Sequence, residues 1–177
     1  MKAGFVVLFC ACTALAQGQS FFDDFTRGSD PGPLTPWSVQ SGTWSVTGGG
    51  LKAGANAASS FGYAYIANSS WTNYSVEALV RFSTTSAYGG GIGGRFNPAC
   101  GAHYAAYICP ENSPAGGKTL QIYKLQDWQS IEFTNDTDQA MAIVSLPSVG
   151  TNWHSLKLAF QECQFVPTLG KLTIAIA

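Results

Sequence analysis

Charged residues are scarce in this sequence. Lysine, arginine, aspartate and glutamate make up 11% of its 177 residues, against roughly 25% in ordinary soluble domains. The nine basic and ten acidic residues leave a formal net charge of −1. Because no segment carries a basic stripe, nucleic acid and anionic membrane surfaces are poor candidates as partners, and neither nucleic-acid binding nor membrane insertion is predicted.

Long apolar runs are also absent, apart from one at the beginning. Lys2 precedes an apolar run from Gly4 to Leu15, and Ala14-Leu15-Ala16 matches the small-x-small pattern of signal-peptide cleavage. The run is shorter than the roughly 20 residues that span a bilayer. We therefore predict a secretory signal peptide over residues 1–16 and a single soluble domain over 17–177. This domain is expected to be secreted, periplasmic or at the cell surface.

Few cysteines remain once a signal peptide is removed. Cys100, Cys109 and Cys163 are left, in a compartment that permits disulfides. Cys100 and Cys109 flank a predicted strand and are expected to form a disulfide, with two separate buried thiols as the alternative. The chain has only two histidines and no C-x-x-C pair, so a zinc site is not supported.

No segment shows the 3.6-residue apolar period of an amphipathic helix, and a two-residue period is present instead. Between Asn73 and Phe82, apolar residues occupy every second position, and Trp153 to Phe160 alternates in the same way. About ten short segments of this kind, separated by turn signals, predict an all-β sandwich. Among them are a first strand over Phe21 to Phe25 and a hairpin around Ser41-Gly42.

Four of these segments are FFDDFTRG, PLTPWSVQSGTWSVTGGGL, WTNYSVEALVRF and WHSLKLAF, between Phe21 and Phe160. Together they resemble the concanavalin A-like lectin/glucanase superfamily, nearest to the laminin-G-like modules of exported bacterial proteins. The resemblance implies a jelly-roll sandwich of two antiparallel sheets, one of which is often concave and able to hold a glycan.

The chain departs from this family pattern after Phe160. Family members continue with further paired strands, whereas Gln161 to Leu169 contains Pro167, which cannot donate a backbone hydrogen bond to a sheet. The sandwich is therefore expected to be altered or incomplete at its C-terminal end, as a truncated or shifted reading frame would make it.

Paired acids of the kind used in glycoside hydrolysis are missing from the expected strand. The resemblance implies three acids at alternate positions in hydrolytic members, where this sequence has Glu77, Leu79 and Arg81. Hydrolysis is therefore disfavoured. Asp136 and Asp138 supply oxygen ligands suited to a structural calcium, with a solvated loop as the default interpretation. No other metal and no cofactor is predicted.

Aromatic and arginine side chains carry the remaining functional signal. Sugars stack their C–H faces on Trp and Tyr, while Arg and amide groups bind their hydroxyls. The candidate residues combine these chemistries and are Arg81, Arg95, Tyr107, Gln121, Tyr123 and Trp128. They predict a non-catalytic, lectin-like module that binds a polysaccharide or other glycan. A glycoside hydrolase or lyase of the same fold, a cell-surface module that contacts proteins, and simple core packing of the aromatics are the alternatives.

Overall fold

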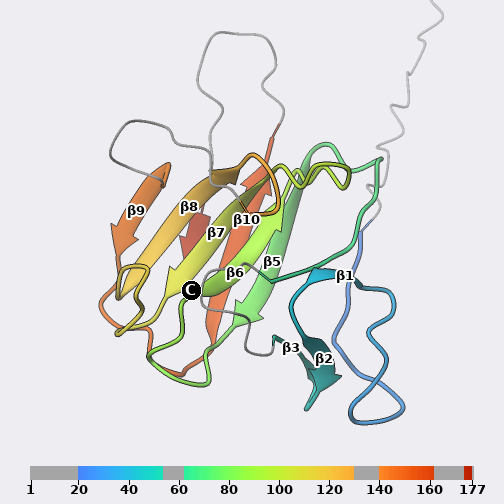
Figure 1. Cartoon of the computed structure of the whole chain (residues 1–177), viewed down its shortest axis with the longest axis horizontal. Coiled ribbons are helices and arrows are strands. Elements are labelled where there is room, and N and C mark those ends of the chain that lie inside the picture. Colours follow the sequence, from blue (N-terminus) through green and yellow to red (C-terminus); the bar gives the residue numbers. More distant parts are fainter. Residues whose placement is uncertain (1–19, 54–61, 130–139, 162–173, 177) are drawn as a thin grey trace, which may run out of the picture.

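The computed structural model describes residues 20–53, 62–129, 140–161 and 174–176. Within these residues the protein is built from β-strands without a helix, and so without a helix able to cross a membrane (Figure 1). The strands are β1 (Ser38–Ser41), β2 (Trp44–Thr47), β3 (Gly50–Ala53), β4 (Tyr63–Tyr65), β5 (Tyr74–Val80), β6 (Gly90–Gly94), β7 (His103–Cys109), β8 (Thr119–Leu125), β9 (Ala142–Ser145), β10 (His154–Phe160) and β11 (Ile174–Ile176).

Two antiparallel sheets face each other and form the body of the molecule (Figure 1). One sheet is a meander in the order β6-β7-β8-β9, and the other has the order β11-β10-β5. β10 pairs with β5 along its whole length, from His154 opposite Val80 to Phe160 opposite Tyr74. Neither sheet closes into a barrel over the described ranges. The predicted all-β, antiparallel sandwich is confirmed.

The core lies between these sheets and follows the two-residue alternation of the strands. Leu156, Leu158 and Phe160 of β10 are at most 7% exposed and pack in one cluster with Ile108 of β7. Leu79 of β5 points to the other side of its sheet and is 65% exposed. Because burying one such side chain is worth about 1.5–3 kcal/mol, the alternation decides which face of each strand turns inward.

Two small sheets lie beside the sandwich (Figure 1). β2 pairs with β3 across Gly48-Gly49, and both glycines have the positive φ (59° and 70°) that a two-residue hairpin turn favours. β1 pairs with the distant β4 instead of with β2. The predicted hairpin around Ser41-Gly42 is therefore wrong, because the partner of β1 is set by a contact that no local turn signal encodes.

The N-terminal segment is a folded loop, and the strand predicted over Phe21 to Phe25 is wrong. The carboxylates of Asp23 and Asp24 accept hydrogen bonds from the backbone N–H groups two residues further on, in turns that aspartate favours. The guanidinium of Arg27 then donates two hydrogen bonds to Asp23 and three to backbone carbonyls. Side-chain bonds thus take the place of sheet pairing in this segment.

The predicted disulfide between Cys100 and Cys109 is wrong, since both are free thiols. Cys100 is exposed before β7, and Cys109 is buried at the far end of this strand. A seven-residue strand spans about 20 Å at roughly 3.3 Å per residue, whereas bridged Cα atoms lie within about 7 Å. The extended strand therefore holds the two thiols apart.

Several predictions fall outside the described residues and stay predictions. They concern the signal peptide over residues 1–16, the calcium ligands Asp136 and Asp138, and the segment with Cys163 and Pro167. Beyond that segment, β11 pairs antiparallel with β10, with Ile176 opposite Leu156.

Candidate functional site

The predicted glycan-binding residues are divided between the two sheets. Tyr107 of β7 and Gln121 and Tyr123 of β8 share the face of the four-stranded sheet that points away from the core. Arg81 follows β5 in the other sheet and lies over the exposed ring of Trp153. The structure therefore does not bring Arg81 beside Tyr123, because the core separates the two outer faces.

Tyr107, Gln121 and Tyr123 form a row that is joined by its own contacts. The rings of Tyr107 and Tyr123 are 5.7 Å apart, and the Tyr123 hydroxyl donates to the side-chain carbonyl of Gln121. The Gln121 amide donates to the Ala115 carbonyl and the Thr119 hydroxyl, both at 2.8 Å. Gln121 is only 3% exposed, so its polar atoms are used inside the protein.

An aromatic cluster, made of Tyr63, Tyr65, Phe96, His103 and Trp128, covers part of this face. Tyr63 and Tyr65 are two residues apart on β4 and therefore point the same way. The Tyr63 ring lies 5.2 Å from His103 and 5.3 Å from Trp128, and Phe96 lies 4.8 Å from Trp128. Trp128 is thus a packing residue between β4 and the sheet. The alternation in Tyr63-Ala64-Tyr65 was the only sequence signal for this layer.

Burial changes the pKa values of Tyr63 and His103 in this cluster and of Tyr107 on the same face of the sheet. It raises the pKa of Tyr107 to about 12 and also raises the pKa of Tyr63. Burial lowers the pKa of His103, which is 7% exposed, although a hydrogen bond from its Nδ1 to the Gly101 carbonyl at 2.7 Å partly opposes this. His103 is therefore held as a neutral imidazole.

The neutral state of His103 predicts a pH dependence of stability. Since an unfolded histidine has a pKa of about 6.5, the unfolded state binds more protons than the folded state as the pH falls through that value. The free energy of unfolding should decrease between about pH 7.5 and pH 5. His103→Asn, which keeps a donor for Gly101, should reduce that decrease in urea denaturation. Equal decreases in both proteins would contradict the assignment.

The outer face of the three-stranded sheet presents a different surface, which we call the Trp153 face. It consists of Leu79, Arg81 and Trp153, beside the Glu77–Lys157 ion pair at 3.2 Å. Trp153 is 54% exposed, the most exposed of the five tryptophans, and the Arg81 guanidinium carbon lies 4.5 Å from its ring centroid. Sequence analysis named Arg81 but missed Trp153, whose outward position in the alternation was the available signal.

Arg95 lies in neither of these groups. It follows β6 with a left-handed φ of 51°, and its backbone N–H donates to the Tyr74 hydroxyl of β5. Its guanidinium carbon lies 5.8 Å from the ring centroid of Phe160 in β10. Arg95 therefore links one end of the four-stranded sheet to the sheet opposite.

The carboxylates within the described residues all serve the structure through hydrogen bonds or an ion pair. They are Asp23, Asp24, Asp30, Glu77, Glu111 and Asp127. Backbone N–H groups of Val149 and Gly150 lower the pKa of Glu111 to about 2. Arg27 and the Thr47 hydroxyl hold the pKa values of Asp23 and Asp30, respectively, below the usual range. A glycosidase general acid needs a raised pKa instead.

Metal ligands do not gather in the part of the chain that the structure describes. No group of three or more His, Cys, Asp or Glu side chains lies there with the proximity needed to hold an ion.

No protein-family model matches the chain, and no curated protein or solved structure is significantly similar to it. The structure confirms the all-β, antiparallel part of the predicted resemblance.

Proposed function

We propose that this protein is an exported, non-catalytic carbohydrate-binding module of the concanavalin A-like type, and that the Trp153 face binds the glycan. The exposed Trp153 ring with the Arg81 guanidinium beside it is the observation that carries the proposal. An exposed indole offers an apolar surface to the C–H face of a sugar. Arg81 and Lys157 supply hydrogen-bond donors for the hydroxyls.

The geometry of this face favours an extended polysaccharide over a chain end. Trp153 directly precedes β10 and Lys157 lies within it, four residues further on, or about 13 Å at strand spacing. β10 is paired along seven residues with β5, so the backbone that carries these side chains is held in place. A row of groups on a sheet surface suits a ligand that lies along the strands.

Binding without cleavage is supported by the state of the acids. Glu77, beside the face, is paired with Lys157 at 3.2 Å. Retaining and inverting glycosidases need two carboxyl groups at roughly 5–10 Å across the bond, and the other described carboxylates are engaged by backbone or side-chain donors elsewhere in the fold. The face therefore fits a lectin-like role better than a hydrolase or lyase role.

Replacing Trp153 with alanine should weaken binding to the recognised polysaccharide by about tenfold or more, because the stacking surface is lost. The mature protein would be screened against a panel of polysaccharides by pull-down and affinity electrophoresis, with release of reducing sugar followed in parallel. Tyr88→Ala is the matched control, since Tyr88 is equally exposed (55%) but lies in the loop before β6. Release of reducing sugar, or equal binding by both variants, would contradict the proposal.

One observation favours a second function, contact with another protein. β9 is an edge strand of its sheet. Ile143 and Val144 within β9 and Met141 just before it are 45–56% exposed. An exposed apolar edge strand can pair with an extended segment of a partner. Absence of binding to every glycan in the panel would favour this second function.

A further inference from the structure

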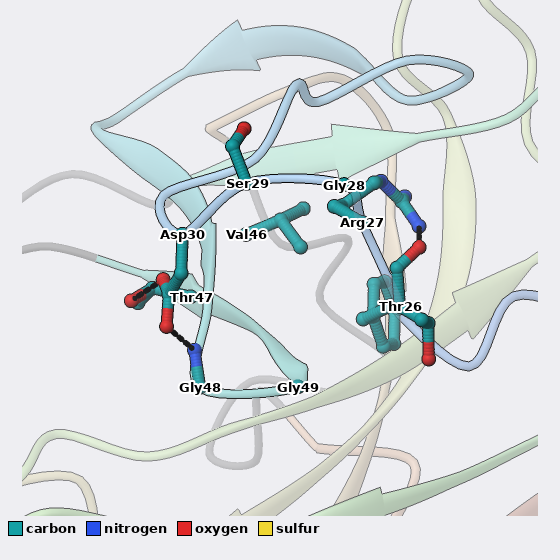
Figure 2. A pocket seen from close by; sticks show the side chains of 10 residues that line it. Thr26, Arg27, Gly28, Ser29, Asp30, Val46, Thr47, Gly48 and Gly49 are labelled. Atoms are coloured by element: carbon teal, nitrogen blue, oxygen red, sulfur yellow. Dashed lines mark hydrogen bonds between the residues drawn. The ribbon is translucent and has the colours of Figure 1, made fainter.

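A pocket of about 410 Å³ lies between the N-terminal loop and the β2–β3 turn. Its size falls within the roughly 300–1,000 Å³ typical of small-molecule sites. Figure 2 shows Asp30 and Thr47 on one side of the pocket, Thr26 and Arg27 on the other, and Val46 between them. The pocket shares no residue with the Trp153 face.

Hydrogen bonds between the loop and the hairpin fix the shape of the pocket. The Asp30 carboxylate accepts from the Thr47 hydroxyl at 2.5 Å and from the Gly48 backbone N–H at 3.1 Å (Figure 2). The Gly32 N–H donates to the Val46 carbonyl at 2.8 Å. These bonds hold the walls together, so the pocket does not depend on a ligand to form.

The charges around the pocket leave it negative. All five N–H groups of the Arg27 guanidinium are used: two hydrogen bonds go to Asp23 and three to backbone carbonyls. The positive charge of Arg27 is therefore balanced by Asp23. The partners of Asp30, in contrast, are a neutral hydroxyl and a neutral amide. Each oxygen of this carboxylate accepts one of these bonds and retains a further lone pair for a ligand.

The rest of the lining is apolar or hydroxylated. Phe25 provides apolar surface, Thr26 and Ser29 provide hydroxyls, and Val46, which is 2% exposed, closes the floor of the pocket. We propose that the pocket binds a small hydroxylated ring that carries a protonated amine, as an unacetylated amino sugar does. The ammonium group pairs with Asp30, the C–H face of the ring packs on Phe25, and the sugar hydroxyls bind the hydroxyls of Thr26 and Ser29. A single carboxylate is too few ligands for a calcium ion.

Glucosamine, N-acetylglucosamine and glucose would be titrated into the full mature protein by NMR, at a pH that keeps the glucosamine amine protonated. We expect millimolar binding of glucosamine with shifts of the Gly48 and Gly49 amides. Binding of the two uncharged sugars should be about tenfold weaker or more, because a charge-assisted hydrogen bond is lost. Equal binding of glucose and glucosamine, shifts outside the pocket, or no binding below about 10 mM would overturn the proposal.

Variants separate the carboxylate from the fold and from the glycan-binding face. Asp30→Asn keeps an acceptor for the Gly48 N–H and should weaken glucosamine binding about tenfold. The affinities for N-acetylglucosamine and glucose should stay unchanged. Asp24→Asn is the matched control, because Asp24 is a neighbouring exposed acid outside the pocket lining. Trp153→Ala should bind glucosamine normally, so failure of one binding proposal is distinguishable from failure of the other. Equal affinities for Asp30→Asn and Asp24→Asn would overturn the role of Asp30.

Discussion

Replacing Gly91 with alanine is expected to destabilise the protein by about 3 kcal/mol or more, at the upper end of overpacking effects. Gly91 lies in β6, opposite Tyr107 of β7. A Cβ atom at this position would lie 1.8 Å from the Ala106 carbonyl oxygen and 2.8 Å from its carbon. Both are backbone atoms of the paired strand, which cannot move aside without breaking the β6–β7 ladder. Urea denaturation measures the loss.

Gly90→Ala is the matched control for this substitution. Gly90 is the preceding residue of the same strand, and a Cβ there meets only the Phe82 ring at 3.6 Å. The substitution also reduces the freedom of the unfolded chain, which is worth about 0.4–1 kcal/mol where the native backbone accepts alanine. Gly90→Ala should therefore leave stability unchanged or slightly raised. Similar unfolding midpoints for the two variants would show that β6 does not approach β7 as described.

Arg27→Met is expected to lower the free energy of unfolding, because it leaves the half-buried Asp23 carboxylate without its cation and its two guanidinium hydrogen bonds. The side chains of Arg27 and Asp23 are only 13% and 8% exposed. The indole N–H of Trp37 donates at 2.8 Å to Asp23 Oδ2, which also accepts from Arg27. Phe21 and Phe25 pack around the Trp37 ring. Removal of the guanidinium should open the loop that forms one wall of the pocket. Hydrogen exchange of residues 20–37 would report this opening.

A second variant separates two effects of Arg27→Met on stability: the carboxylate of Asp23 loses its ion pair, and the packing of the Arg27 side chain is lost. Asp23→Asn combined with Arg27→Met should be more stable than Arg27→Met alone, since no unpaired carboxylate remains. The pH profile offers a separate check. The pKa of Asp23 is lowered chiefly by its hydrogen bonds with Arg27, so its contribution is present above the ordinary aspartate pKa of about 3.9 and decreases as the pH falls below it. A double variant no more stable than the single one would contradict this account.

Sequence analysis succeeded where a local pattern carries the information. Alternation between Asn73 and Phe82 and between Trp153 and Phe160 predicted strands, which the structure has as β5 and β10, and Leu156 and Leu158 on one face of β10 are buried. The absence of a helical period predicted an all-β chain. It failed where the partner of a segment lies far along the chain. Ser41-Gly42 carries a turn signal, yet β1 pairs with β4. The spacing of Cys100 and Cys109 suggested a disulfide, yet the strand between them is extended and holds them apart.

The predicted binding residues were divided for the same reason. Residue types suited to sugars identified Arg81 and Tyr123, but alternation within one strand does not specify in which sheet that strand lies. Tyr63 of β4 packs on His103 and Trp128. The part of the predicted binding surface that contains Trp128 is therefore in contact with β4. Arg81 lies over the Trp153 ring because β10 pairs with β5.

By itself, the sequence determined the antiparallel β architecture and which side chains of the long strands face the core, because the period of two and the hydrophobic effect act residue by residue. Only the tertiary structure decided which described side chains of the outer faces are exposed and which glycines lie too close to a neighbouring strand to carry a Cβ atom. It also decided that the N-terminal loop and the β2–β3 turn line an open, negatively charged pocket. Those features depend on segments that meet through long-range pairing, and a one-dimensional pattern does not record which segment meets which.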